Sequence, residues 1–136
     1  MASRQNGERT RVMIVEQDWN FGVKLADWLA AHGYHPVFVR TVDAAIDGMS
    51  DFRPQAVFVG LSCSASAERI DMIEILLLIQ TLCPCAPLIM LADQTGKDLT
   101  HVVFRQGVRR FLVKPVAFSQ IGEAFQSELS AVTVTV

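Results

Sequence analysis

Short runs of apolar, often β-branched residues alternate along the chain with longer stretches in which apolar residues recur every three or four positions. The first pattern is typical of strands buried on both faces, and the second of amphipathic helices. The apolar runs predict five strands, at residues 11–15, 36–39, 56–60, 87–91 and 110–113. A helical stretch follows each of them, so the pattern indicates five β/α repeats.

Polar residues and glycines mark where several of these helices begin and end. Asp18 and Thr41 stand where helices start, and their side chains can accept a hydrogen bond from a free backbone N–H. Gly33, Pro84 and Gly107 stand where the first, third and fourth helices are expected to end. The apolar positions of the five helices are Phe21, Leu25, Trp28 and Leu29; Ala45, Ile46 and Met49; Ile70, Ile73 and Leu77; Leu99, Val102 and Val103; and Phe118, Ile121 and Phe125.

Strict alternation predicts an α/β fold with a doubly wound, five-stranded parallel sheet. Right-handed crossovers favour the order 2-1-3-4-5, with a switch point between the first and third strands, although periodicity alone does not give that order. We expect one domain at residues 11–130, after a disordered tail at 1–10 and before a C-terminal tail at 131–136. The last six residues, AVTVTV, alternate like a strand without an obvious partner, so they are either disordered or paired in an oligomer.

Composition narrows the classes of partner. About half of the 136 residues are apolar and the formal net charge is −2, so no basic field is present to hold nucleic acid. The longest apolar run, residues 72–79, contains Glu74 and is too short to cross a bilayer. Without a signal peptide or a membrane segment, the expected location is the cytoplasm.

Three cysteines, Cys63, Cys83 and Cys85, argue against a disulfide framework because their number is odd. The Cys83-Pro84-Cys85 stretch resembles half of a metal site. No second C-x-x-C pair and no H-x-x-x-H accompanies it, so small buried or loop thiols are the main interpretation. We expect no metal ion and no cofactor.

The carboxyl ends of parallel strands meet at one edge of the sheet, which makes the residues there the candidate site. They are Glu16, Gln17 and Asp18 after the first strand, Gly60 at the end of the third, Ala92 and Asp93 after the fourth, and Lys114 and Pro115 after the fifth.

Four stretches on these elements, RVMIVEQD, RPQAVFVGLS, PLIMLAD and QGVRRFLVKP, resemble the motifs of response-regulator receiver domains of the chemotaxis Y type. The resemblance covers roughly residues 10–130. It implies the flavodoxin-like receiver fold and a role in two-component signal transduction.

The resemblance also implies that the phosphorylation pocket is degenerate. Gly60 falls where the family carries its phosphoacceptor aspartate, and Glu16 and Gln17 stand for its acidic pair. Ala92 replaces a hydroxyl residue, whereas Lys114 is retained. Such a site lacks the nucleophile, so we expect no catalytic residue and no enzyme activity.

Four further interpretations stay open. Glu16 and Asp18 are weak candidates for binding Mg²⁺, and Asp18 serves either the pocket or only the helix cap. Lys114 either retains a functional role or pairs structurally with Glu16 or Asp18, because a partly buried ammonium needs an acid. Phe111 occupies the switch-aromatic position of the family, and a simply half-buried ring is the alternative.

The expected function is a phosphorylation-independent, atypical receiver domain that mediates protein–protein interaction or dimerisation in signalling or transcription regulation. By family analogy, the contact face comprises helix 4, strand 5 and helix 5. The partner is a histidine kinase, an output domain, another regulator or a second copy; nucleic acid and membranes are not expected to bind directly. The alternatives are phosphorylation at a nonstandard residue, such as Asp93 or Ser62, and a small-ligand sensor that uses the vacated pocket.

Overall fold

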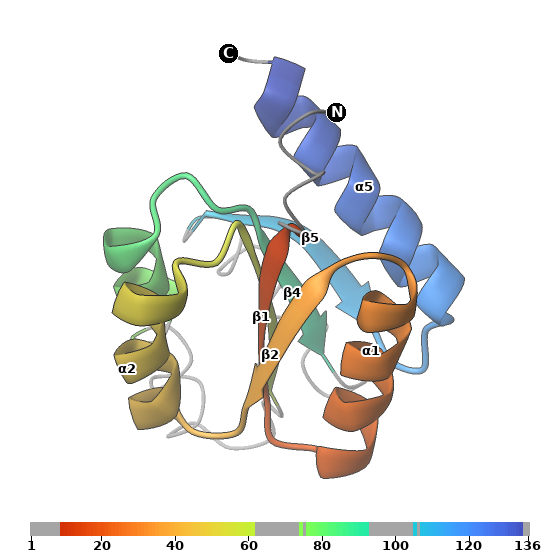
Figure 1. Ribbon diagram of the computed structural model, residues 1–136, viewed down its shortest axis with the longest axis horizontal. Coiled ribbons are helices and arrows are strands. Elements are labelled where there is room, and N and C mark those ends of the chain that lie inside the picture. The colour runs from red at the N-terminus through yellow and green to blue at the C-terminus, as the bar shows by residue number, and fades with distance from the viewer. Residues whose placement is uncertain (1–8, 62–73, 75, 93–104, 106, 135–136) are drawn as a thin grey trace.

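The computed structural model describes residues 9–61, 74, 76–92, 105 and 107–134. Five parallel strands form one sheet in the order β2-β1-β3-β4-β5, which confirms the predicted flavodoxin-like topology (Figure 1). Every strand lies within two residues of its predicted position. The bounds are Arg11–Glu16 for β1, His35–Val39 for β2, Ala56–Leu61 for β3, Leu88–Ala92 for β4 and Val108–Val113 for β5.

Both predicted helix caps are confirmed. Helix α1 (Trp19–Ala31) begins after Asp18, whose Oδ1 accepts a hydrogen bond from the backbone N–H of Phe21 at 3.3 Å. Helix α2 (Val42–Phe52) begins after Thr41, whose Oγ1 accepts one from the N–H of Ala44 at 3.1 Å. Each cap satisfies a backbone donor that the first helical turn leaves free.

The later helices are described in part. Residues 74 and 76–82 are helical, as expected for the third helix, and we call residues 76–82 the 76–82 helix. The predicted fourth helix, with Leu99, Val102 and Val103, lies outside the described residues, as do residues 1–8, Ser62, Cys63 and Asp93.

Helix α5 runs from Phe118 to Val134 and therefore continues past the expected boundary at residue 130. The interpretation of the C-terminal residues as a strand or a disordered tail is wrong for residues 131–134. Adding residues to an existing helix forms one hydrogen bond each without a new nucleation cost, which offsets the weak helix preference of valine and threonine.

At the N-terminal end of the sheet, Thr10, just before β1, is buried, and its carbonyl oxygen accepts a hydrogen bond from the N–H of His35 at 2.9 Å.

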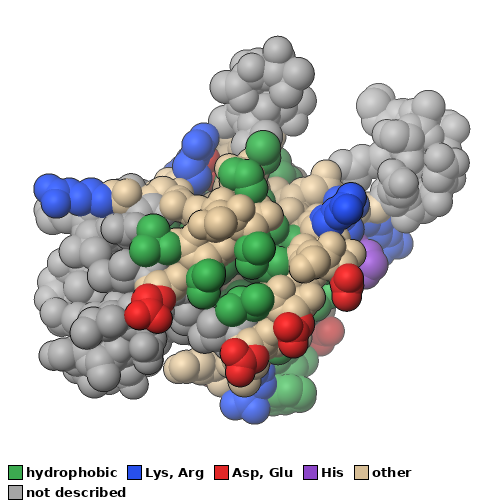
Figure 2. Space-filling view, turned by 90° about the vertical axis from the view of Figure 1, so that its left-hand side faces the viewer, with side chains coloured by type: hydrophobic (Ala, Val, Ile, Leu, Met, Phe, Trp, Pro, Cys, Tyr) green, Lys and Arg blue, Asp and Glu red, His purple; other side chains and the backbone are tan. Residues whose placement is uncertain are grey.

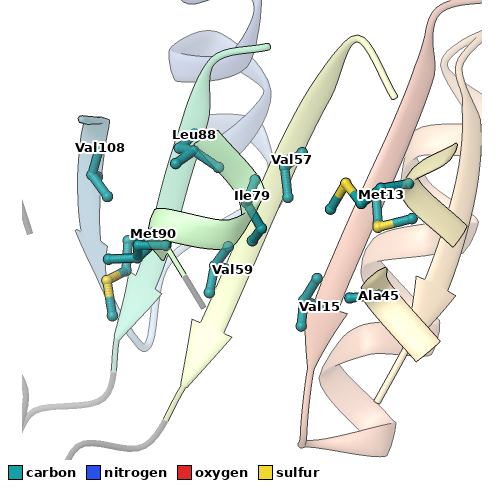
Figure 3. Close-up of a cluster of buried hydrophobic side chains, with 11 residues drawn as sticks. Met13, Val15, Ala45, Val57, Val59, Ile79, Leu88, Met90 and Val108 are labelled. Atoms are coloured by element: carbon teal, nitrogen blue, oxygen red, sulfur yellow. The ribbon is translucent and has the colours of Figure 1, made fainter. Parts of the chain in front are cut away.

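Successive strand residues face opposite sides, so the sheet has two buried faces. Figure 3 shows one of them, where Val57, Val59 and Leu88 lie near Ile79 of the 76–82 helix, and Met13 lies on the side of α2. The other face places Ile14, Phe58 and their neighbours against α1 and α5. Burial on both sides explains why the strands have continuous apolar runs.

The side of the molecule that carries α2 and the 76–82 helix has an apolar surface. Figure 2 shows hydrophobic side chains gathered there, with acidic and basic groups around them. Leu77, Leu78 and Leu82 are among the exposed large hydrophobic residues. None of the described helices is both long and apolar enough to span a membrane.

Candidate functional site

The site forms at the carboxyl edge of the sheet, where the strand register brings distant residues together. Glu16, the last residue of β1, is the register partner of Gly60 in β3. Lys114 follows β5 directly, and its backbone N–H donates a hydrogen bond to the carbonyl oxygen of Ala92 at 2.7 Å. The sheet thus gathers Glu16, Gly60, Ala92 and Lys114 at the edge that the sequence predicts.

The central interaction is an ion pair between Lys114 and Glu16. Lys114 Nζ donates to Glu16 Oε1 at 2.7 Å, and the two side chains are 22% and 3% exposed. The second oxygen, Oε2, accepts a hydrogen bond from the backbone N–H of Asp18 at 3.1 Å. The expected pairing of Lys114 with Glu16 or Asp18 is confirmed, with Glu16 as the acid, and both oxygens of that carboxylate have a donor, as a buried charge requires.

The absence of a side chain at Gly60 allows the Glu16 carboxylate to lie against β3. A Cβ atom on residue 60 would overlap Glu16 Oε1 and would lie 2.6 Å from Glu16 Cδ. The carboxylate of Glu16 therefore occupies the space that any side chain at position 60 would need. Glu16 and Gly60 are therefore sterically complementary: the Glu16 carboxylate, from β1, fills the space next to Gly60 of β3.

Phe21 belongs to this site although the sequence pattern placed it only on the apolar face of a helix. Lys114 Nζ lies 4.2 Å from the centroid of the Phe21 ring, within the range of a cation–π contact. The Phe21 ring in turn lies 5.8 Å from that of Phe118, the first residue of α5. No local signal identifies this role, because it depends on how α1 is placed relative to the end of β5.

The other residues after β1 point to structural roles. Asp18 is exposed and caps α1, which favours the capping role over the pocket role. Gln17 is also exposed, and its carbonyl oxygen accepts a hydrogen bond from Arg40 Nη2 at 3.1 Å. Phe111 is half-buried and packs against the core on the α2 side, in agreement with the simpler of its two interpretations.

The arrangement offers little to a magnesium ion. Mg²⁺ requires several oxygen ligands in near-octahedral geometry. Both oxygens of Glu16 are engaged, and Asp18 Oδ1 accepts from a backbone N–H. Within the described ranges, no group of three or more His, Cys, Asp and Glu side chains is placed to hold a metal ion.

Comparisons with known proteins agree on the fold. No known family model matches the sequence, and no curated protein does. A CheY-like receiver domain protein from Methanospirillum hungatei JF-1 matches with a TM-score of 0.80 at 15% identity, over 95% of this chain and 100% of that one. A receiver domain protein from Clostridium thermocellum matches with a TM-score of 0.79 at 12% identity, over 93% and 99% of the two chains.

NtrX from Brucella abortus matches with a TM-score of 0.80 at 18% identity, over 94% of this chain and 28% of the longer one. The chain therefore has the flavodoxin-like fold of response-regulator receiver domains, the class that its four motifs resemble.

Proposed function

We propose that this chain is a phosphorylation-independent receiver-type module that acts in the cytoplasm by binding a protein partner in signal transduction. The observation that carries the proposal is the Glu16–Lys114 pair. It places a carboxylate against the lysine without a phosphoacceptor at position 60. Glu16 lies on the neighbouring strand, so its carboxylate neutralises Lys114 without supplying the nucleophile that the receiver resemblance places at position 60.

The same observation weighs against a small-ligand sensor at this edge, because the carboxylate of Glu16 fills the space above Gly60. Phosphorylation at a nonstandard residue is the remaining alternative. Its candidates, Asp93 and Ser62, lie outside the described residues, so the chemical test must locate any adduct along the whole chain.

The test is phosphoryl transfer from acetyl phosphate in the presence of Mg²⁺, followed by intact-mass measurement and peptide mapping. We expect no adduct on the natural chain. The matched control is a variant that carries Glu16→Asp, Gln17→Asp, Gly60→Asp and Ala92→Thr together, which restores the groups that the receiver resemblance implies. A folded control that gains one phosphoryl group shows that the assay works on this scaffold, whereas an acyl phosphate on the natural chain overturns the proposal.

For the partner, we favour the face formed by β5 and α5. Glu128 of α5 is buried and accepts hydrogen bonds from Arg109 Nε at 3.1 Å and Arg110 Nε at 2.8 Å. Two guanidinium groups around the one carboxylate of Glu128 leave a local positive charge at this point of the face, which suits an acidic group on a partner. The helix-4 part of the predicted face lies outside the described residues.

The contact face is tested by affinity capture from the source cell, with and without acetyl phosphate. Arg109→Ala should weaken capture of the partner, because it removes a positive charge from the proposed contact face. The variant should still fold, because Arg110 still pairs with Glu128. Leu78→Ala, on the exposed 76–82 helix, should leave capture unchanged, and so should the phosphodonor. The reverse pattern would place the contact on the apolar side shown in Figure 2 and would overturn the proposed face.

A further inference from the structure

Three sulfur-containing side chains line one cavity at the amino end of the sheet, away from Glu16 and Lys114. Cys83 and Cys85 lie on the loop between the 76–82 helix and β4, and Met49 lies in α2. The Cys83 thiol donates to Met49 Sδ, with the two sulfur atoms 3.4 Å apart. All three side chains line one cavity of about 450 Å³.

We propose that Met49, Cys83 and Cys85 form a binding site for a soft monovalent metal ion of the copper(I) class. Thiolate and thioether sulfur favour such an ion over hard cations, which prefer oxygen. A zinc site would normally need four ligands, nitrogen or sulfur, and no group of three or more His, Cys, Asp and Glu side chains is placed to hold a metal in the described part of the chain. This inference does not rest on the function proposed above.

The spacing of the sulfur atoms suits a shared ion. Three sulfur ligands, each about 2.3 Å from one metal, lie roughly 4.0 Å apart in a trigonal arrangement. The observed 3.4 Å between Cys83 Sγ and Met49 Sδ therefore needs to open by about 0.6 Å. Methionine is flexible enough to allow this shift because its side chain is unbranched.

Burial changes across the site in a way that allows an ion to enter. Met49 is buried, Cys83 is half-buried and Cys85 is exposed. An ion can therefore meet Cys85 first and pass to Cys83 and Met49, which lie deeper. The buried thioether can then exclude water from one side of the bound ion.

The chemistry of binding balances without any redox step. Two S–H bonds break, two metal–thiolate bonds form, and two protons pass to the solvent, while the methionine sulfur donates a lone pair. The bound group carries a net charge of −1. Arg53 lines the same cavity and supplies a positive charge. Arg53 ends α2 with a left-handed backbone (φ 52°), a conformation that favours glycine. Arginine therefore occupies this position at a conformational cost.

The experiment uses the full chain with Cys63→Ser, since Cys63 lies outside the described residues and offers a competing thiol. Copper(I) is titrated into the reduced protein without oxygen, against a chromophoric copper(I) chelator. We expect one ion per chain. Removing a partner of a metal ligand costs about 10- to 100-fold in affinity, so losing a ligand itself in Cys83→Ser, Cys85→Ser or Met49→Leu should cost at least that much.

The matched control is Met90→Leu, which changes a buried methionine of the same core cluster that does not line the cavity. It should bind copper(I) as the parent does. X-ray absorption should count three sulfur neighbours around copper in the parent and two in Met49→Leu, a readout that holds even if a variant loses stability. Absence of stoichiometric binding, unchanged affinity in Met49→Leu, or loss of binding caused by Cys63→Ser alone would each overturn the proposal.

Discussion

The carboxylate of Glu16 lies where a side chain on Gly60 would be, with Glu16 Cδ 2.6 Å from the position of a Cβ atom on residue 60. The two residues are 44 positions apart in the chain and are register partners in neighbouring strands. This relationship links the degenerate pocket to stability: the glycine creates the space, the glutamate fills it, and the lysine neutralises the glutamate.

Gly60→Ala should destabilise the fold by about 1–3 kcal/mol, the usual range for overpacking a core, because the new methyl group displaces the Glu16 carboxylate from Lys114. Urea unfolding measures the change. The cost should be smaller when Gly60→Ala is made in a Glu16→Ala background, because the clashing group is then absent. An equal cost in both backgrounds would contradict this steric account.

Lys114→Met should cost about 3 kcal/mol, because it leaves the buried carboxylate of Glu16 without its cation. Glu16→Ala should cost less, since the Lys114 side chain is 22% exposed and its ammonium can move toward solvent. The double variant should be more stable than Lys114→Met alone. The control is Lys24→Met, at an exposed position of α1, which should change the free energy of unfolding little. If Lys114→Met cost no more than this control, the pairing argument would be refuted.

Asp18→Ala should cost about 1 kcal/mol, the typical value for losing an N-cap, whereas Asp18→Asn should be nearly neutral because asparagine caps equally well. Thr41→Ala, which removes the cap of α2, provides a matched comparison. Thermal unfolding measures all three. A large loss in Asp18→Asn would instead mean that the charge of Asp18 acts in the pocket.

Cys83 should react with iodoacetamide more slowly than Cys85 at pH 8 in the Cys63→Ser chain. Burial raises the pKa of the Cys83 thiol above its ordinary value, which reduces its reactive thiolate fraction at that pH. Its alkylation rate should therefore keep rising as the pH is raised further, until the thiolate predominates. Peptide mass spectrometry follows each site separately, and faster labelling of Cys83 than of exposed Cys85 would contradict the packing described for it.

Much of the fold follows from local patterns in the sequence. Strand positions, the caps at Asp18 and Thr41, and the gathering of Glu16, Gly60 and Lys114 at one edge were all predicted. Each depends on side-chain periodicity, on hydrogen bonding within a few residues, or on the rule that parallel strands end at the same edge. The extension of α5 to Val134 was not predicted, because helix elongation depends on the helix already formed.

Tertiary structure decided which groups touch at that edge. From the sequence, Lys114 can pair with Glu16 or with Asp18, and the lysine is the group expected to lack a partner if neither acid is near. The register of β1 against β3 directs Glu16 over Gly60 and buries it more deeply than the lysine. Likewise, the Phe21–Lys114 and Cys83–Met49 contacts join segments far apart in the chain. Such contacts depend on the relative placement of packed elements to within about an ångström, which periodicity along the chain does not encode.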